Sequence, residues 1–217
     1  VLTFSCFLAS HSLTLSLSYN HRLVLFSLPV KLEQMKLKFN SPVILGFSLL
    51  CVAVFVLDKV MVGTLMPYFT LGNVSTSSPL SLLTLFTHVI GHASIEHLMG
   101  NLTFILLLGP IVEEKYGDSR TLFMMLITAL VTGILNLLFF HTGLMGASGI
   151  VFMLILLVSF TNTKSGEIPV TFILVALLFI GKEVIESLNT DQISQFAHII
   201  GGVCGSVFGF ATRPGRS

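Results

Sequence analysis

Residues 122–140 read LFMMLITALVTGILNLLFF and contain no charged side chain. At 1.5 Å per residue, a helix of this length covers most of the roughly 30 Å hydrocarbon layer of a bilayer. Five more apolar stretches lie on either side of it, at residues 43–67, 88–112, 148–160, 168–185 and 195–211. The sequence therefore predicts an all-α polytopic membrane protein with six helical spans.

The composition of the whole chain supports a membrane protein. Of the 217 residues, 53% are hydrophobic and 10% are charged, and the mean hydropathy is +0.95. A soluble domain carries about 25% charged residues, so lipid must cover part of this surface. The net charge is +1 and basic residues form no cluster, which argues against a nucleic-acid partner. The lipid bilayer is the expected surrounding.

The fourth stretch, residues 148–160, is shorter than the others. Its helix would not cross the whole hydrocarbon layer, and backbone that ends inside a membrane must be enclosed by protein. We therefore expect a short central fourth helix that starts partway through the membrane and is walled by the other helices.

Basic residues predict the orientation of the spans. Those between or beside the spans are Lys36, Lys38, Lys115, Arg120, Lys164, Arg213 and Arg216. The alternate connections, at residues 62–87, 141–147 and 186–194, contain no Lys or Arg. Because cytoplasmic loops carry the excess of Lys and Arg, both termini are predicted to be cytoplasmic, in a multi-pass protein of the cell membrane.

Residues 1–34 differ from the rest of the chain. They are rich in Ser, Leu and His and precede Met35, which is followed by a basic segment typical of the start of a membrane protein. We expect residues 1–34 to be an upstream or non-native extension and residues 35–217 to form the six-helix domain. A signal-like segment is the alternative, although no Ala-x-Ala cleavage site follows it.

Three histidines and an asparagine on the second stretch are candidate functional residues. His97 and Asn101 are four residues apart, so a helix would place them on one face. His88 and His92 have the same spacing, which also suits a metal site, but a third ligand and the Glu of a His-Glu-x-x-His motif are missing. Hydrogen bonds from His88 and His92 to neighbouring loop backbone are the favoured interpretation.

The segment Gly146-Ala147-Ser148-Gly149 opens the fourth stretch. Small neighbours leave the serine hydroxyl accessible, and a helix N-terminus offers free N–H groups to a developing anion. Such a serine could act as an acyl-transfer nucleophile, although small residues in membrane helices more often form packing surfaces. Ile150 excludes the Gly-x-Ser-x-Gly elbow of the α/β-hydrolases.

Glycines recur at every fourth residue of the sixth stretch, at Gly201, Gly205 and Gly209. They form a groove in which another helix can pack closely, and His198 lies one turn away. If the partner is the helix of Ser148, the His198 imidazole could accept the serine proton as a general base.

Together these residues resemble those of the rhomboid intramembrane serine proteases. The resemblance extends from about residue 36 to residue 211 and is carried by four separated motifs. These are His92-x4-His97-x3-Asn101, Glu113-x3-Gly117, Gly146-Ala147-Ser148-Gly149 and Ala197-His198-x2-Gly201-x3-Gly205. The resemblance implies a rhomboid-like bundle of six transmembrane helices.

The resemblance also implies an activity. Ser148 would be the nucleophile and His198 the general base, and His97 and Asn101 would bind the oxyanion together with the Ser148 N–H. Supporting positions would be His92, Phe152, Gly146, Gly201 and Gly205. The implied enzyme is a serine endopeptidase without cofactor or metal, which cleaves membrane proteins in or near their transmembrane segments. Its active site would open to the extracytoplasmic side.

Two features depart from the family pattern. Phe152 stands where many members have a tyrosine that stacks on the base, so the ring is kept without its hydroxyl. The loop at residues 63–85 lacks the Trp-Arg pair found in many members. Two alternatives stay open, namely a catalytically silent rhomboid-like protein that binds transmembrane segments and a small membrane transporter lined by His88, His92 and His97.

Overall fold

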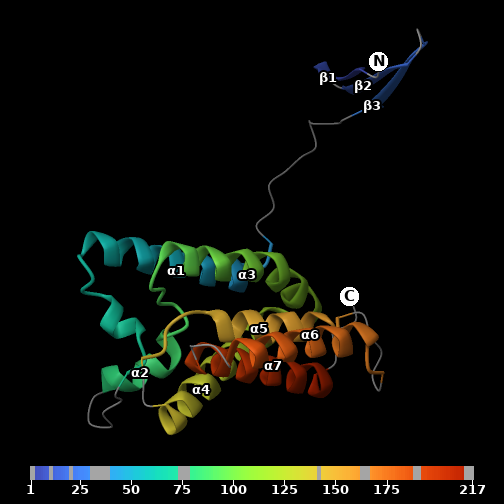
Figure 1. The fold of residues 1–217 in the computed structure, drawn as a ribbon. Helices are drawn as coiled ribbons and strands as arrows, with labels where there is room; N and C mark the ends of the chain where they lie inside the picture. The colour runs from blue at the N-terminus through green and yellow to red at the C-terminus, as the bar shows by residue number, and fades with distance from the viewer. Residues whose placement is uncertain are drawn as a thin grey trace. The chain divides into compact units, whose positions relative to one another are not determined.

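The computed structural model describes residues 3–9, 12–19, 22–29, 40–72, 79–140, 143–161, 167–187 and 192–212 (Figure 1). The chain divides into two compact units, Val1–Phe39 and Asn40–Ser217. The second unit contains all of the candidate site residues.

The first unit is a three-stranded antiparallel sheet in the order β1-β2-β3. The strands are β1 (Thr3–Ala9), β2 (Ser12–Tyr19) and β3 (Arg22–Pro29), and β2 pairs with both neighbours. β2 reads SLTLSLSY, and this alternation of polar and apolar residues is typical of a strand. The expectation of an all-α chain therefore does not extend to residues 3–29.

The second unit is helical. Its elements are α1 (Pro42–Val60), the 3₁₀ helix η2 (Met66–Phe69), α2 (Pro79–Thr87), α3 (Ile95–Tyr116), α4 (Asp118–Phe139), α5 (Ser148–Val158), α6 (Val170–Ser187) and α7 (Gln192–Ala211). Each of the six predicted stretches overlaps one of the helices α1 and α3 to α7, although the first was predicted to residue 67 and α1 ends at Val60. The nine-residue α2 is additional and was not predicted.

The second stretch begins later than the sequence suggested. Residues 88–94 form turns rather than helix, and α3 starts at Ile95. The Ser94 side chain caps α3 by accepting a hydrogen bond from the His97 backbone N–H at 3.2 Å. His88 and His92 therefore do not share a helical face, whereas His97 and Asn101 do.

Three of the described helices, α1, α3 and α4, are long and apolar enough to cross a membrane. Their length and composition support a membrane protein. The described apolar parts of α5 and α7 are shorter. A total of six membrane-crossing helices stays a prediction.

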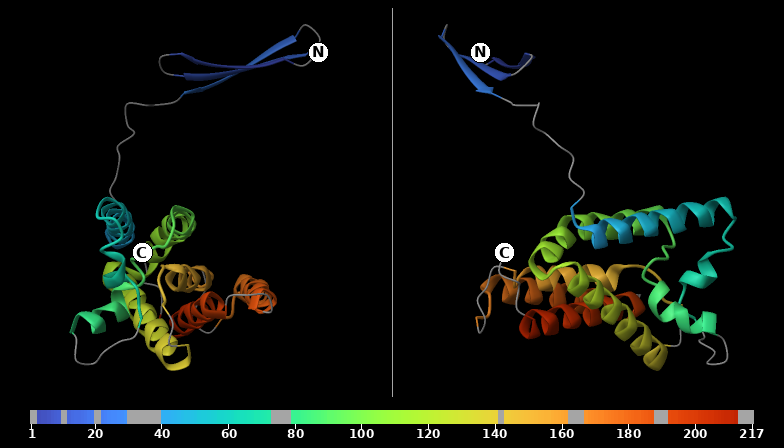
Figure 2. Two further views of the ribbon diagram at one scale, coloured as in Figure 1. Left: turned by 60° about the vertical axis from the view of Figure 1, so that its left-hand side comes forward. Right: turned by 180° about the vertical axis from the view of Figure 1, so that it is seen from behind.

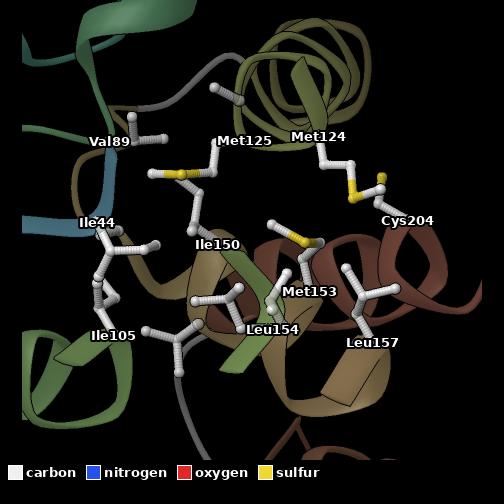
Figure 3. Packing of buried hydrophobic residues seen from close by; sticks show 14 of the residues in the cluster. Ile44, Val89, Ile105, Met124, Met125, Ile150, Met153, Leu154, Leu157 and Cys204 are labelled. Atoms are coloured by element: carbon white, nitrogen blue, oxygen red, sulfur yellow. The ribbon is translucent and has the colours of Figure 1, made fainter. Parts of the chain in front are cut away.

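Helix α5 has the short length predicted for the fourth stretch and lies inside the bundle, in contact with α3, α4 and α7 (Figure 2, left). Most of its apolar side chains are buried, and Phe152, Ile155 and Val158 are partly buried. Figure 3 shows Ile150, Met153, Leu154 and Leu157 among side chains from α1, α3, α4 and α7, including Ile44, Ile105, Met124 and Cys204. This enclosure explains how a helix of 11 residues can be held at a defined depth.

A buried carboxylate joins α3 to the start of α1. Glu113 is 3% exposed, and its two oxygens accept hydrogen bonds from the backbone N–H groups of Val43 and Ile44, each at 2.9 Å. The first N–H groups of a helix have no partner within it. Glu113 supplies that partner from another helix and thereby connects α1 to α3.

We expect Glu113→Ala to destabilise the protein, because two backbone N–H groups would lose a charged acceptor. The expected loss is roughly 3 kcal/mol of the free energy of unfolding. Thermal unfolding in detergent would measure it, with the exposed neighbour Glu114→Ala as the matched control. Equal midpoints for the two variants would contradict this role of Glu113.

Candidate active site

His92 and Asn101 form a buried pair beside the N-terminal turns of α3. His92 Nδ1 lies 3.0 Å from the Ile90 carbonyl oxygen, and His92 Nε2 lies 3.0 Å from Asn101 Nδ2. The tautomer that satisfies both contacts carries its proton on Nδ1, so Nε2 accepts a hydrogen bond from the Asn101 amide. His92 is 1% exposed and Asn101 is 6% exposed. The histidine thus fixes the orientation of the Asn101 side chain.

His88 has a separate role in the same loop. Its Nδ1 lies 3.1 Å from the Thr84 carbonyl oxygen, while its own carbonyl oxygen accepts a hydrogen bond from the Gly146 N–H at 2.9 Å. The predicted hydrogen bond to loop backbone is therefore confirmed for His92, whereas His88 bonds to a carbonyl oxygen within α2. Among the residues that the structure describes, no three His, Cys, Asp or Glu side chains are grouped to hold a metal ion.

The His97 ring lies against Gly146, two residues before Ser148. A Cβ added at Gly146 would fall 2.7 Å from His97 Nε2, so only glycine leaves room for the imidazole. Gly146 also has φ +117, a backbone conformation that favours glycine. The ring of His92 meets that of His97 edge to face, with centroids 5.1 Å apart. His97 is thereby placed between the His92–Asn101 pair and the loop that leads to Ser148.

Helices α5 and α7 meet backbone to backbone. A Cβ added at Gly201 would fall 2.8 Å from the carbonyl carbon of Gly149, and one added at Gly205 would fall 3.0 Å from that of Met153. The glycine groove predicted on the last helix therefore receives α5. Near the start of α5, a Cβ added at Gly149 would lie 3.5 Å from the Ala197 carbonyl oxygen.

Ser148 and His198 lie next to this contact between the two helices, Ser148 on α5 and His198 on α7. Ser148 directly precedes Gly149, and His198 directly follows Ala197. Phe152, four residues after Ser148 on the same face of α5, packs on the His198 ring with centroids 4.2 Å apart and an interplanar angle of 31°. The imidazole therefore lies along the face of α5 that carries Ser148.

The start of α5 adds backbone donors to these side chains. Helix α5 begins at Ser148, and its N-cap residue, Ala147, makes no side-chain cap hydrogen bond. The N–H groups of the first helical turn point out of the helix and carry partial positive charge. A partly exposed hydroxyl, two imidazoles, an amide and a helix N-terminus thus meet in one region. Such a set can activate a nucleophile and stabilise an oxyanion.

The Rhomboid domain family model matches residues 79–215, which is more than half of the chain. The chain belongs to the rhomboid family. Among similar proteins is the Rhomboid protease GlpG of Haemophilus influenzae, 24% identical over 127 residues, which cover 57% of this chain and 66% of that protein. The Rhomboid protease GlpG of Yersinia pestis is 24% identical over 174 residues, covering 78% of this chain and 62% of that protein. This rhomboid therefore spans less than two thirds of the length of these relatives.

All of the site residues predicted from the sequence of this rhomboid lie in one region of the second unit. His92, His97 and Asn101 come from α3 and the loop before it, Gly146, Ser148 and Phe152 from α5 and the loop before it, and His198, Gly201 and Gly205 from α7. Contacts between His97 and Gly146, between Gly149 and Gly201, and between Phe152 and His198 bring these three segments, distant in the sequence, together.

One backbone contact beside the candidate site was missed. Leu71, just after η2, and Leu144, just before the Gly146-Ala147-Ser148-Gly149 segment, exchange two backbone hydrogen bonds of 2.9 and 2.8 Å. Both side chains are buried. The pairing joins main-chain atoms of two loops and leaves no polar motif in the sequence, so spacing and composition could not reveal it.

Proposed function

We propose that this rhomboid is an intramembrane serine endopeptidase that hydrolyses peptide bonds in or near transmembrane segments by a Ser148–His198 dyad. The observation that supports the proposal most is the packing of the His198 ring on Phe152, one turn from Ser148 at the uncapped start of α5. The names of the similar proteins, which are rhomboid proteases, support the same activity.

In the proposed reaction, Ser148 Oγ attacks the carbonyl carbon of the scissile peptide while the His198 imidazole accepts the hydroxyl proton. The carbonyl oxygen becomes an oxyanion that accepts hydrogen bonds from the Ser148 N–H and the side chains of Asn101 and His97. His198 then donates its proton to the leaving amine. Water, deprotonated by His198, hydrolyses the acyl-enzyme and regenerates Ser148.

The proposed substrate is a transmembrane segment of another membrane protein. The short α5 would hold Ser148 at membrane depth, and the polar side chains around it would admit the water that hydrolysis needs. A helical substrate shields its carbonyl carbons, so residues that weaken a helix, such as Gly and Pro, should favour cleavage. With both termini cytoplasmic, the site would open to the extracytoplasmic side.

Cleavage in proteoliposomes would test the proposal. The substrates would be single-span reporter proteins that differ only in having Leu or Gly-Pro near the extracytoplasmic end of the span. We expect cleavage of the Gly-Pro reporter by the parent, no cleavage by Ser148→Ala, and a product terminus within or beside the span by mass spectrometry. Binding of the reporter without cleavage by the folded parent would instead support a catalytically silent rhomboid-like protein.

The proposed oxyanion site predicts the effect of Asn101→Ala. Loss of one oxyanion donor typically costs about 10²- to 10³-fold in turnover, or about 2.7 to 4 kcal/mol. We expect a loss of this size in reporter cleavage with little change in KM. Thr103→Ala, at an exposed position of α3, is the matched control. An unchanged turnover in a folded Asn101→Ala protein would remove Asn101 from the oxyanion site.

A further inference from the structure

Asp58 is a buried carboxylate near the end of α1. It is 3% exposed, and its Oδ1 accepts hydrogen bonds from the backbone N–H groups of Leu65 and Met66, at 3.0 and 2.9 Å. Its carbonyl oxygen accepts another from the Gly63 N–H at 2.8 Å. The turn between these residues includes Val62 at φ 55, a conformation that β-branched residues rarely adopt. Asp58 thus holds a strained turn and fixes the start of η2.

The segment that Asp58 fixes contacts the loop carrying His92. The Thr87 hydroxyl donates a hydrogen bond to the Tyr68 carbonyl oxygen at 2.7 Å. A Cβ added at Gly91 would fall 2.9 Å from Phe69 Cβ and 3.2 Å from the Phe69 carbonyl carbon, so these two backbones are in close contact. Gly91 directly precedes His92, which orients Asn101.

The same segment also contacts the loop that precedes Ser148. Two residues after η2, Leu71 exchanges its pair of backbone hydrogen bonds with Leu144. The Gly146 N–H of that loop donates a hydrogen bond to the His88 carbonyl oxygen at 2.9 Å. This hydrogen bond joins the loop before Ser148 to the loop that carries His92. Residues 65–71 therefore contact both loops whose separation sets the distance between Ser148 and the oxyanion donors.

We propose that Asp58 is a positioning residue for the reaction of Ser148. By fixing the start of η2, its carboxylate sets the position of residues 65–71, and these hold the His92 loop and the Ser148 loop at the separation that catalysis needs. The inference rests on the proposed function and adds to it a residue that lies outside the reacting groups. A displacement of about 1 Å at such a site can cost about 10²-fold in rate.

Glu113, on α3, provides a matched comparison at the opposite end of α1. Both carboxylates are 3% exposed, and each accepts two backbone N–H groups, Glu113 at the first residues of α1 and Asp58 beyond its last turn. Loss of either should destabilise the fold. Only the end of α1 near Asp58 continues into residues 65–71, which contact the site. We therefore expect only the loss of Asp58 to change the labelling rate per folded molecule.

The test is the rate of labelling by a fluorophosphonate serine probe, per folded molecule and well below the unfolding midpoint of each variant. We expect Asp58→Ala to react about tenfold to 10²-fold more slowly than the parent. Asp58→Asn, whose amide oxygen can still accept both N–H groups, should stay within about threefold. Glu113→Ala should show a lower midpoint and the parental rate.

Thr87→Val removes a hydrogen bond from the same segment, residues 65–71, and should disturb the fold less. This variant replaces Asp58→Ala in the test if Asp58→Ala does not fold. Without the hydroxyl that donates to Tyr68, we expect labelling to slow about threefold at a near-parental midpoint. A parental rate in folded Asp58→Ala, or in Thr87→Val if Asp58→Ala does not fold, would overturn the inference, as would an equal slowing in Glu113→Ala. A folded parent that is not labelled at all would overturn the proposed function and this inference with it.

Discussion

Ser148→Ala is expected to abolish covalent labelling by a fluorophosphonate probe in detergent-solubilised protein. The probe reacts only with an activated serine hydroxyl, and Ser148 is the serine that begins α5 beside the His198 ring. His198→Ala should slow labelling by about 10²- to 10⁴-fold, because the hydroxyl would lose its general base. The two variants therefore test the nucleophile and the base separately.

Controls for this experiment come from other polar side chains of the same helices. Ser206, on α7, donates a hydrogen bond to the Gly202 carbonyl oxygen at 2.9 Å and lies two turns beyond His198. Ser206→Ala should be labelled like the parent. Strong labelling that persists in a folded Ser148→Ala protein would exclude Ser148 as the nucleophile, and parental labelling of His198→Ala would exclude the proposed dyad.

Gly201→Leu is expected to have the second large effect. The backbone of Gly201 touches that of Gly149, so even a Cβ would overlap the Gly149 carbonyl group, and the neighbouring backbone cannot rotate away as a side chain would. Overpacking a well-packed core typically costs about 1 to 3 kcal/mol, and we expect the upper part of this range or more. The helices α5 and α7 would separate, and with them Ser148 and His198.

The expected result is a lower unfolding midpoint together with a loss of labelling of at least about 10²-fold in the molecules that remain folded. Gly201→Ala should show a smaller change in the same direction. Gly46→Leu is the matched control, because Gly46 lies on an exposed face of α1 with no atom within 4 Å of an added Cβ. Parental labelling of Gly201→Leu would show that the contact at Gly149 does not hold the dyad together.

Much of the helical unit could be predicted from local patterns. The apolar run at residues 122–140 became α4, and the shortness of the stretch after Ser148 predicted the enclosed α5. Burial of apolar side chains and the thickness of a bilayer act on each stretch separately, so length and hydropathy reveal them. The strands of residues 3–29 were missed although β2 alternates with period two, because residues 1–34 were set apart as an extension and not examined for secondary structure.

The sequence by itself determined the membrane class, the helical stretches and the candidate residues, because side-chain chemistry and spacing are local properties. Only the tertiary structure decided which of these residues meet. The Leu71–Leu144 pairing, the hydrogen bonds from the Val43 and Ile44 N–H groups to Glu113, and the contact between Gly201 and Gly149 depend on main-chain atoms of segments distant in the sequence. Any residue can supply a backbone N–H or carbonyl group, so contacts of this kind leave no signature in the order of side chains.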